Sequence, residues 1–173
     1  MAATSQGRFI YSLRFIPDEI DRAKLRTTLL YLFSDRIRAG LEWNPLADDA
    51  SVLVNVHIVR EGKRKPAVIF GLSSDRIGTP YGKSLFLTAS RDFGIGAGVS
   101  IAPYVGAAHG TYEDKTRAIG GVNLRLAKSL SALAIFDGVH LHEVLTLEKG
   151  RHAVSAVFIR NGRRIGVSYN VVF

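Results

Sequence analysis

The last nine residues, I-G-V-S-Y-N-V-V-F at positions 165–173, decide the fold class because apolar and small or polar residues alternate along them. Successive side chains of a β-strand point to opposite faces, so this segment would present one apolar face that ends in an aromatic ring. The other face would be small and polar apart from Val172. The segment is therefore predicted to be a strand with two very different sides.

Hairpin signals connect this strand to the sequence before it. The run 154–159 leads into Arg160-Asn161-Gly162-Arg163, and Asn-Gly supplies the positive φ angles of a tight type I′ turn. Asp137-Gly138 is a second signal of the same kind. Both turns predict antiparallel pairing between strands that are adjacent in the chain.

The same two-residue period runs back to the N-terminus, and helical periodicity is limited to one turn within 18–26. No break in composition marks a linker, so residues 1–173 are predicted to form a single all-β domain of about twelve antiparallel strands, with ten as the alternative count. The predicted strands are 8–16, 25–33, 36–44, 52–60, 67–74, 84–91, 95–109, 116–126, 130–136, 139–147, 152–160 and 163–173.

Composition excludes several classes of protein. The 173 residues are 47% hydrophobic and 22% charged, which is ordinary for a folded chain. The absence of cysteine rules out disulfide frameworks, cysteine-ligated metal centres and thiol catalysis. A net charge of +8 favours anionic partners. No apolar run approaches the roughly 18 residues of a membrane helix.

The predicted connections differ in length on alternate sides of the sheet. Segments 17–24, 45–51, 75–83 and 110–115 are long, whereas 34–35, 92–94, 127–129 and 148–151 are short. The segment 61–66 and the tight turns at 137–138 and 161–162 are exceptions. Long loops at one end and short turns at the other are typical of antiparallel up-and-down transmembrane β-barrels.

The faces of the strands agree with that class. The polar faces are rich in Gly and Ser, and aromatic residues gather near strand ends, where the interfacial girdles of membrane barrels lie. If the apolar faces contact lipid, the strands must close into a ring, because an open edge in lipid would leave backbone groups unpaired. These aromatic residues are Phe9, Phe15, Tyr31, Phe33, Trp43 and Phe173.

The C-terminal segment resembles the last strand of bacterial outer-membrane β-barrel proteins, which alternates in polarity and ends in an aromatic residue. The resemblance implies that Val167, Tyr169, Val171 and Phe173 form the signal read by the barrel-assembly machinery. Segments 66–71, 74–82 and 90–94 are similar to hairpins of porin-like barrels, most closely those associated with polysaccharide export.

The resemblance implies residence in the bacterial outer membrane, with the lipid bilayer as a partner. Members of this family carry a secretory leader, and residues 1–7 (M-A-A-T-S-Q-G) do not look like one. A cytosolic protein would also lack a leader, but the resemblance implies that the leader has been removed.

Arginines on the predicted inner faces are the candidate functional residues. They outnumber the acids predicted there, Glu42 and Asp137, so a low-dielectric lumen would attract anions. We therefore expect a small channel or binding pore for anionic solutes, with no cofactor and no catalysis. The predicted lumenal set is Arg8, Arg14, Arg26, Arg36, Arg38, Arg117, Arg125 and Arg164.

Two other functions fit the same residues. A soluble barrel or sandwich could bind nucleic acid or another polyanion through its arginine face, although few aromatic rings are available there for base stacking, so nucleic acid is not the expected partner. An outer-membrane hydrolase could use Asp137, His140 and Ser155 or Ser168, but no local motif connects them.

Three further patterns are interpreted as structural. His140 and His142 share a strand face, and no metal site is expected from them. Residues 78–84 look like a phosphate loop with the wrong glycine spacing, so a surface turn is predicted. The glycines in 94–98 are predicted to face a narrow lumen or to bend a curved sheet.

Overall fold

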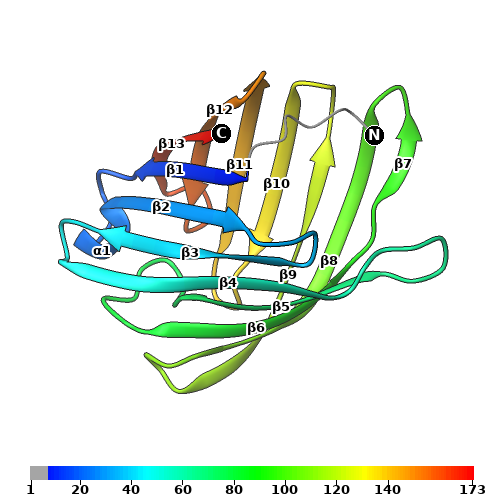
Figure 1. Ribbon diagram of the computed structural model, residues 1–173. Helices are drawn as coiled ribbons and strands as arrows, with labels where there is room; N and C mark the ends of the chain where they lie inside the picture. The colour runs from blue at the N-terminus through cyan, green and yellow to red at the C-terminus, as the bar shows by residue number, and fades with distance from the viewer. Residues whose placement is uncertain (1–7) are drawn as a thin grey trace.

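The computed structural model describes residues 8–173 and shows a closed antiparallel barrel of twelve strands, with one additional short strand (Figure 1). The all-β class and the strand count of twelve are confirmed. The strands are β1 (Phe9–Phe15), β2 (Leu25–Leu32), β3 (Ile37–Asn44), β4 (Asp49–Val59), β5 (Ala67–Ser74), β6 (Lys83–Ser90), β7 (Phe93–Gly96), β8 (Val99–Gly110), β9 (Lys115–Arg125), β10 (Leu130–Phe136), β11 (Leu141–Lys149), β12 (His152–Ile159) and β13 (Arg164–Val172).

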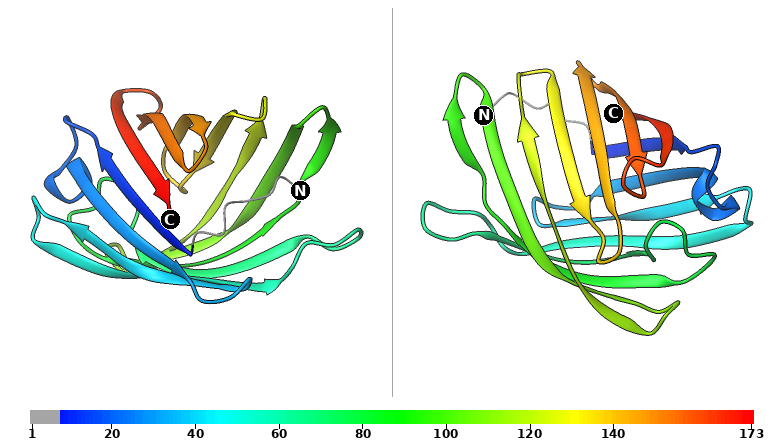
Figure 2. Two further views of the ribbon diagram at one scale, coloured as in Figure 1. Left: turned by 45° about the horizontal axis from the view of Figure 1, so that its top comes forward. Right: turned by 180° about the vertical axis from the view of Figure 1, so that it is seen from behind.

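Strands that follow each other in sequence pair in the sheet, except β6 and β7, and two further pairings close the ring. β13 pairs with β1, where Phe15 lies opposite Val167 and Ile10 opposite Val172. β6 pairs with β8, so β7 is left outside the ring and pairs only with the start of β8. The views in Figure 2 show the two walls, β1–β6 and β8–β13, facing each other across the interior.

The predicted strand 95–109 is wrong at its beginning. Ala97 and Gly98 have φ angles of 51° and 80°, so the chain reverses there and forms the hairpin between β7 and β8. The prediction that the glycines in 94–98 face the lumen is also wrong, because positive φ at Gly96 and Gly98 makes the turn. A two-residue period does not reveal this turn, because small residues such as Gly and Ala are compatible with either face of a strand.

The connections alternate between two ends of the barrel, but the predicted sorting by length is only partly present. Segments 45–48 and 111–114, predicted to be long, are as short as 33–36 and 126–129, and the connections 60–66 and 91–98 at the other end are long. We call one end the loop end; it contains 16–24, 45–48, 75–82, 111–114, 137–140 and 160–163. The other, the turn end, contains 33–36, 60–66, 91–98, 126–129 and 150–151, together with Arg8 and Phe173. The predicted helical turn is present as α1 (Asp21–Lys24) at the loop end. The described residues contain no helix long and apolar enough to cross a bilayer.

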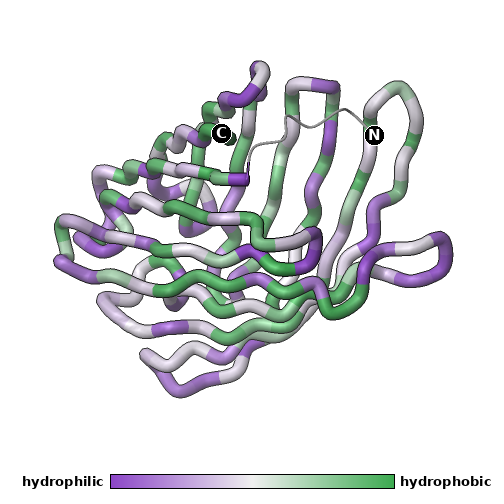
Figure 3. The backbone as a smooth tube through the Cα atoms, viewed as in Figure 1, coloured by the Kyte–Doolittle hydropathy of each residue, from purple (hydrophilic) through white to green (hydrophobic). Residues whose placement is uncertain are grey.

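The outer surface of the barrel is apolar. Five aliphatic residues on the outward faces of their strands have 56% to 66% of their surface accessible: Leu41, Val105, Leu147, Val154 and Val167. Hydrophobic residues recur along the strands in Figure 3, and hydrophilic ones are concentrated in connections such as the hairpin between β4 and β5. The usual arrangement of a water-soluble barrel, with its aliphatic side chains inside, is therefore reversed.

The aromatic residues predicted near strand ends lie on this outer surface. Phe9 contacts Phe173 and Tyr31, with ring centroids 5.9 and 4.8 Å apart, and Tyr31 contacts Phe33 at 4.8 Å. This row follows the turn end across β13, β1 and β2. Near the loop end, Phe15 and Trp43 are 43% and 54% accessible.

The interior is mostly polar and contains a small apolar cluster near the loop end. Ile16 and Ile159 are completely buried and pack with Val157, Val144 and Ile77. Small residues make room for two inward-pointing rings: a Cβ atom on Gly71 would lie 2.1 Å from the Phe86 ring, and one on Gly121 would lie 2.6 Å from the Tyr104 ring. The prediction of a crowded lumen lined by small residues holds at these positions.

Candidate functional site: the interior of the barrel

The strand register decides which predicted arginines face inward. Six of the eight share the face of the buried residues on their strands: Arg14, Arg26, Arg38, Arg117, Arg125 and Arg164. The two others do not lie on an inward strand face. Arg8 precedes β1 and donates a hydrogen bond to the hydroxyl of Tyr31, whose side chain is on the outer face. Arg36 is exposed in the turn between β2 and β3.

The inward arginines divide between the two ends of the barrel. Arg38 and Arg125 lie near the turn end and are exposed to solvent, as are the inward Asn123 and Glu148. The inward positions near the turn end are therefore accessible to water among residues 8–173. Arg14, Arg26, Arg117 and Arg164 lie in the halves of their strands that are nearer the loop end.

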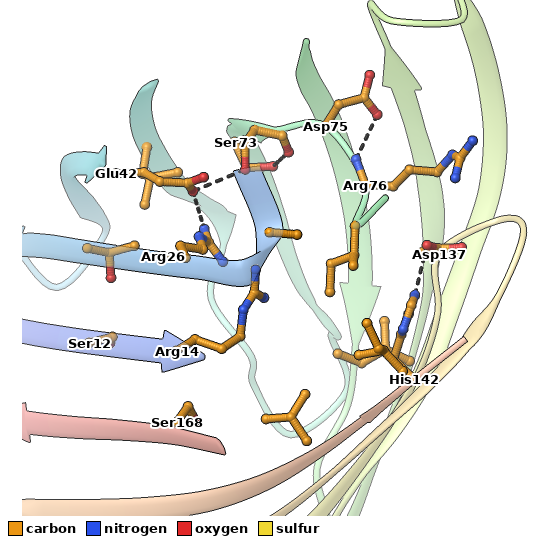
Figure 4. A pocket seen from close by; sticks show the side chains of 18 of the residues that line it. Ser12, Arg14, Arg26, Glu42, Ser73, Asp75, Arg76, Asp137, His142 and Ser168 are labelled. Atoms are coloured by element: carbon orange, nitrogen blue, oxygen red, sulfur yellow. Dashed lines mark hydrogen bonds and ion pairs between the residues drawn. The ribbon is translucent and has the colours of Figure 1, made fainter. Parts of the chain in front are cut away.

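Arg14 and Arg26 line a cavity with a volume of about 560 Å³ (Figure 4). They are directly opposite each other on β1 and β2, and both guanidinium groups reach into the cavity. Ser168 lies opposite Arg14 on its other side, on β13. Ser12 and Asn170 form the next polar pair towards the turn end.

Glu42 supplies the negative charge for Arg26. Its carboxylate is buried on β3, forms an ion pair with Arg26, and accepts hydrogen bonds from Asn44 Nδ2 and Ser74 Oγ, each at 3.0 Å. Glu42 was predicted to be a lumenal acid, and the structure places it there. A buried carboxylate with this many donors stays ionised, because each donor stabilises the charged form.

The loop end is closed by two segments that sequence reasoning treated as ordinary loops. The segment 16–24 enters the mouth of the barrel, and the side chain of Arg22 is buried there. Its guanidinium donates to the carbonyls of Thr79, Asp75 and Arg76 at 2.6, 3.1 and 2.9 Å. Burial lowers the pKa of Arg22 below its ordinary value, although nearby carboxylates oppose that shift.

The loop 75–82 lies across the same mouth. Gly78 approaches Arg160, which belongs to the connection on the opposite side of the ring; a Cβ atom at Gly78 would lie 2.1 Å from that guanidinium. Thr79 is buried, with 1% of the residue accessible. The expected surface turn at 78–84 is therefore wrong in its location, because part of this loop is folded into the barrel.

Acids and bases from different loops hold this closure together. Glu19, whose side chain is completely buried, accepts two hydrogen bonds from Arg160 at 3.0 and 3.1 Å and pairs with Arg164 at 3.1 Å. Glu113 binds both Arg76, at 2.6 Å, and Arg117. Hydrogen bonds from Arg117 and Arg76 lower the pKa of the Glu113 carboxyl below its ordinary value.

Asp137 and His142 form a separate pair on the cavity wall. His142 Nε2 lies 2.9 Å from Asp137 Oδ2, and the backbone N–H of Arg160 points at His142 Nδ1. Burial would raise the pKa of Asp137, but hydrogen bonds from His142 and from the amides of His140 and Val139 outweigh it and lower the pKa. The Asp137-Gly138 turn is therefore an Asp-stabilised loop, and β11 begins at Leu141.

The residues considered for hydrolysis or metal binding are not assembled in the described chain. Asp137 bonds His142 and not the side chain of His140, and Ser155 is hydrogen-bonded to Thr146 at 2.8 Å. Residues 8–173 contain no group of three or more potential metal ligands of the His, Cys, Asp or Glu type.

Sequence reasoning missed five residues that shape the interior: Glu19, Arg22, Asp75, Arg76 and Glu113. All lie in connections or in α1, where no periodicity reports direction. A signal was nevertheless present, because each of the long segments 17–24, 75–83 and 110–115 contains both acidic and basic residues. The five residues are three acids and two arginines, so they offset only a small part of the predicted arginine excess.

The chain matches no model of a known protein family and no curated protein sequence.

Proposed function

We propose that this protein is a bacterial outer-membrane β-barrel that takes small anionic solutes into its arginine-lined interior from the turn end. The observation that carries the proposal is the polarity of the closed ring, with aliphatic and aromatic side chains on the outer surface and charged groups inside. Such a surface is stable in hydrocarbon and unfavourable in water. Ring closure also leaves no backbone edge unpaired in the barrel wall.

The interior supports anions as the solutes. The cavity wall contributes Arg14, Arg22, Arg26 and Arg76 against Glu42, Asp75 and Asp137. The exposed inward Arg38 and Arg125 add positive charge near the turn end. A positive lumen surrounded by low-dielectric walls concentrates anions and repels cations.

The closed loop end favours a binding pore over a wide channel. Segments 16–24 and 75–82 fill that mouth with paired charges and the Ile16–Ile159 cluster. We expect a solute to enter from the turn end and to stop at the cavity unless the loops separate. Barrel-assembly machinery remains the proposed assembly partner, because Val167, Tyr169 and Val171 lie on the outer face of β13 beside its aromatic end.

Membrane insertion and ion selectivity test the proposal. Refolded protein should float with phosphatidylethanolamine–phosphatidylglycerol vesicles after a carbonate wash and should require detergent for solubility. In planar bilayers under a KCl gradient, the reversal potential should indicate anion preference and should shift towards cations in R38E/R125E. Protein that stays soluble without detergent and binds oligonucleotides with a salt-dependent affinity would instead support the polyanion-binding alternative.

A further inference from the structure

Arg14 differs from the other arginines of the cavity wall in having no acceptor. Its Nε atom is buried without a hydrogen bond, as is that of Arg26, but for Arg14 no acceptor for the rest of the guanidinium is present among residues 8–173 either. In Figure 4 no interaction line leaves Arg14, whereas Glu42 is joined to Arg26 and Asp137 to His142. An unpaired guanidinium in such a position is unfavourable unless a ligand completes it.

The neighbours of Arg14 increase this cost. Arg26 lies directly opposite it on β2, and like charges at opposed positions of an antiparallel pair repel each other. The two buried acids nearby are already engaged. Glu42 is bound by Arg26, Asn44 and Ser74, and Glu19 is bound by Arg160 and Arg164. The arrangement therefore leaves one positive charge facing the cavity.

The groups around Arg14 define what could neutralise it. Ser12, Ser168 and Asn170 line the same part of the cavity, and Thr28 and Asn55 line its wall on β2 and β4. Their hydroxyl and amide groups can donate to and accept from alcohols. A volume of about 560 Å³ is in the range of small-molecule sites. Inward positions near the turn end are exposed among residues 8–173, and this is the side from which we expect a solute to enter.

We propose that Arg14 is the anchor of a binding site for a small polyhydroxy monocarboxylate, such as a sugar acid. The guanidinium fork would bind the carboxylate with two parallel hydrogen bonds, and the Ser and Asn side chains would bind the hydroxyl groups. One free cation favours a monoanion over a doubly charged phosphate ester. This inference rests on the proposed function, because it requires an interior that solutes can reach.

Isothermal titration of the refolded protein in detergent tests the site, with D-glucuronate as the probe and D-glucose and glucose 6-phosphate as comparisons. We expect saturable glucuronate binding, at least 30-fold weaker binding of the other two sugars, and a loss of at least 30-fold in R14Q. R14K should keep part of the affinity, since it retains the charge without the fork. R64Q, at an exposed arginine of the connection between β4 and β5, is the matched control and should change affinity less than 3-fold.

A second measurement guards against loss of folding. Glucuronate should raise the urea midpoint of the parent protein and leave that of R14Q unchanged, while both proteins show a β-rich circular dichroism spectrum. Absence of saturable binding, equal affinity for glucose, or unchanged affinity in R14Q overturns the inference. Because the titration is done in detergent, it does not depend on membrane insertion. Glucuronate binding by a protein that does not insert into vesicles would refute only the membrane proposal. Anion-selective insertion, combined with an R14Q variant whose glucuronate affinity is unchanged, would refute only the Arg14 site.

Discussion

Replacing Glu42 with Gln should destabilise the barrel, because it removes one charge from an ion pair whose carboxylate is almost completely buried. The Glu42 side chain is 1% accessible and that of Arg26 is 26% accessible. Removing one partner of a buried pair costs about 3–5 kcal/mol, and the partial exposure of Arg26 places the expected loss near 3 kcal/mol. The substitution preserves size and keeps an oxygen that can accept from Asn44 and Ser74.

The consequence extends beyond Arg26. Without the Glu42 carboxylate, the opposed Arg14 and Arg26 form an uncompensated pair of positive charges. An added divalent anion should then bind between them, so sulfate should recover part of the lost stability in E42Q. The parent protein should respond less, because its Arg26 is already paired.

Reversible urea unfolding in detergent, followed by circular dichroism, measures both effects. E148Q is the control, since Glu148 also lies on an inward register position but is exposed near the turn end. It should change the unfolding free energy by less than about 0.5 kcal/mol. An E42Q value within 1 kcal/mol of the parent, or no selective response to sulfate, would contradict the assignment of Glu42 as the charge that balances this part of the interior.

Three other predictions concern the loop end, the barrel wall and the outer surface. Hydrogen bonds hold the pKa of Glu113 below its ordinary value of 4.5. The stability that the Glu113 carboxylate contributes is therefore complete above pH 4.5 and is lost as the pH falls through the lowered pKa. Between pH 6 and pH 3, the unfolding free energy should decrease less in E113Q than in the parent protein. G121A should lower the urea midpoint much more than G120A, because its Cβ would lie 2.1 Å from the Ala134 carbonyl oxygen whereas the nearest atom at Gly120 is 3.1 Å away; similar midpoints would argue against this wall packing. L145R, at an exposed outward position in the middle of β11, should destabilise the vesicle-inserted protein by about 2–4 kcal/mol, and a cost near zero would oppose a lipid-facing surface.

Much of the interior could not be read from the sequence because its partners come from connections. The periodicity of β1 and β2 correctly directed Arg14 and Arg26 inward, but nothing in either strand indicated that only Arg26 would meet Glu42. The buried positions of Glu19 and Arg22 depend on a nine-residue connection folding into the mouth of the barrel. Arg8 and Arg36 were misplaced for a related reason, since both lie outside regular strands, where alternation no longer gives direction.

The sequence alone determined the properties that repeat locally along the chain: the strands, their two faces, and a strand number that allows an up-and-down ring. A period of two is a property of the extended backbone and requires no knowledge of distant residues. Only the tertiary structure decided where β7 leaves the ring, how loop 75–82 reaches Arg160, and which charges cancel. Those outcomes depend on ring closure, which brings together residues more than a hundred positions apart and leaves Arg14 without a counter-charge in the described chain.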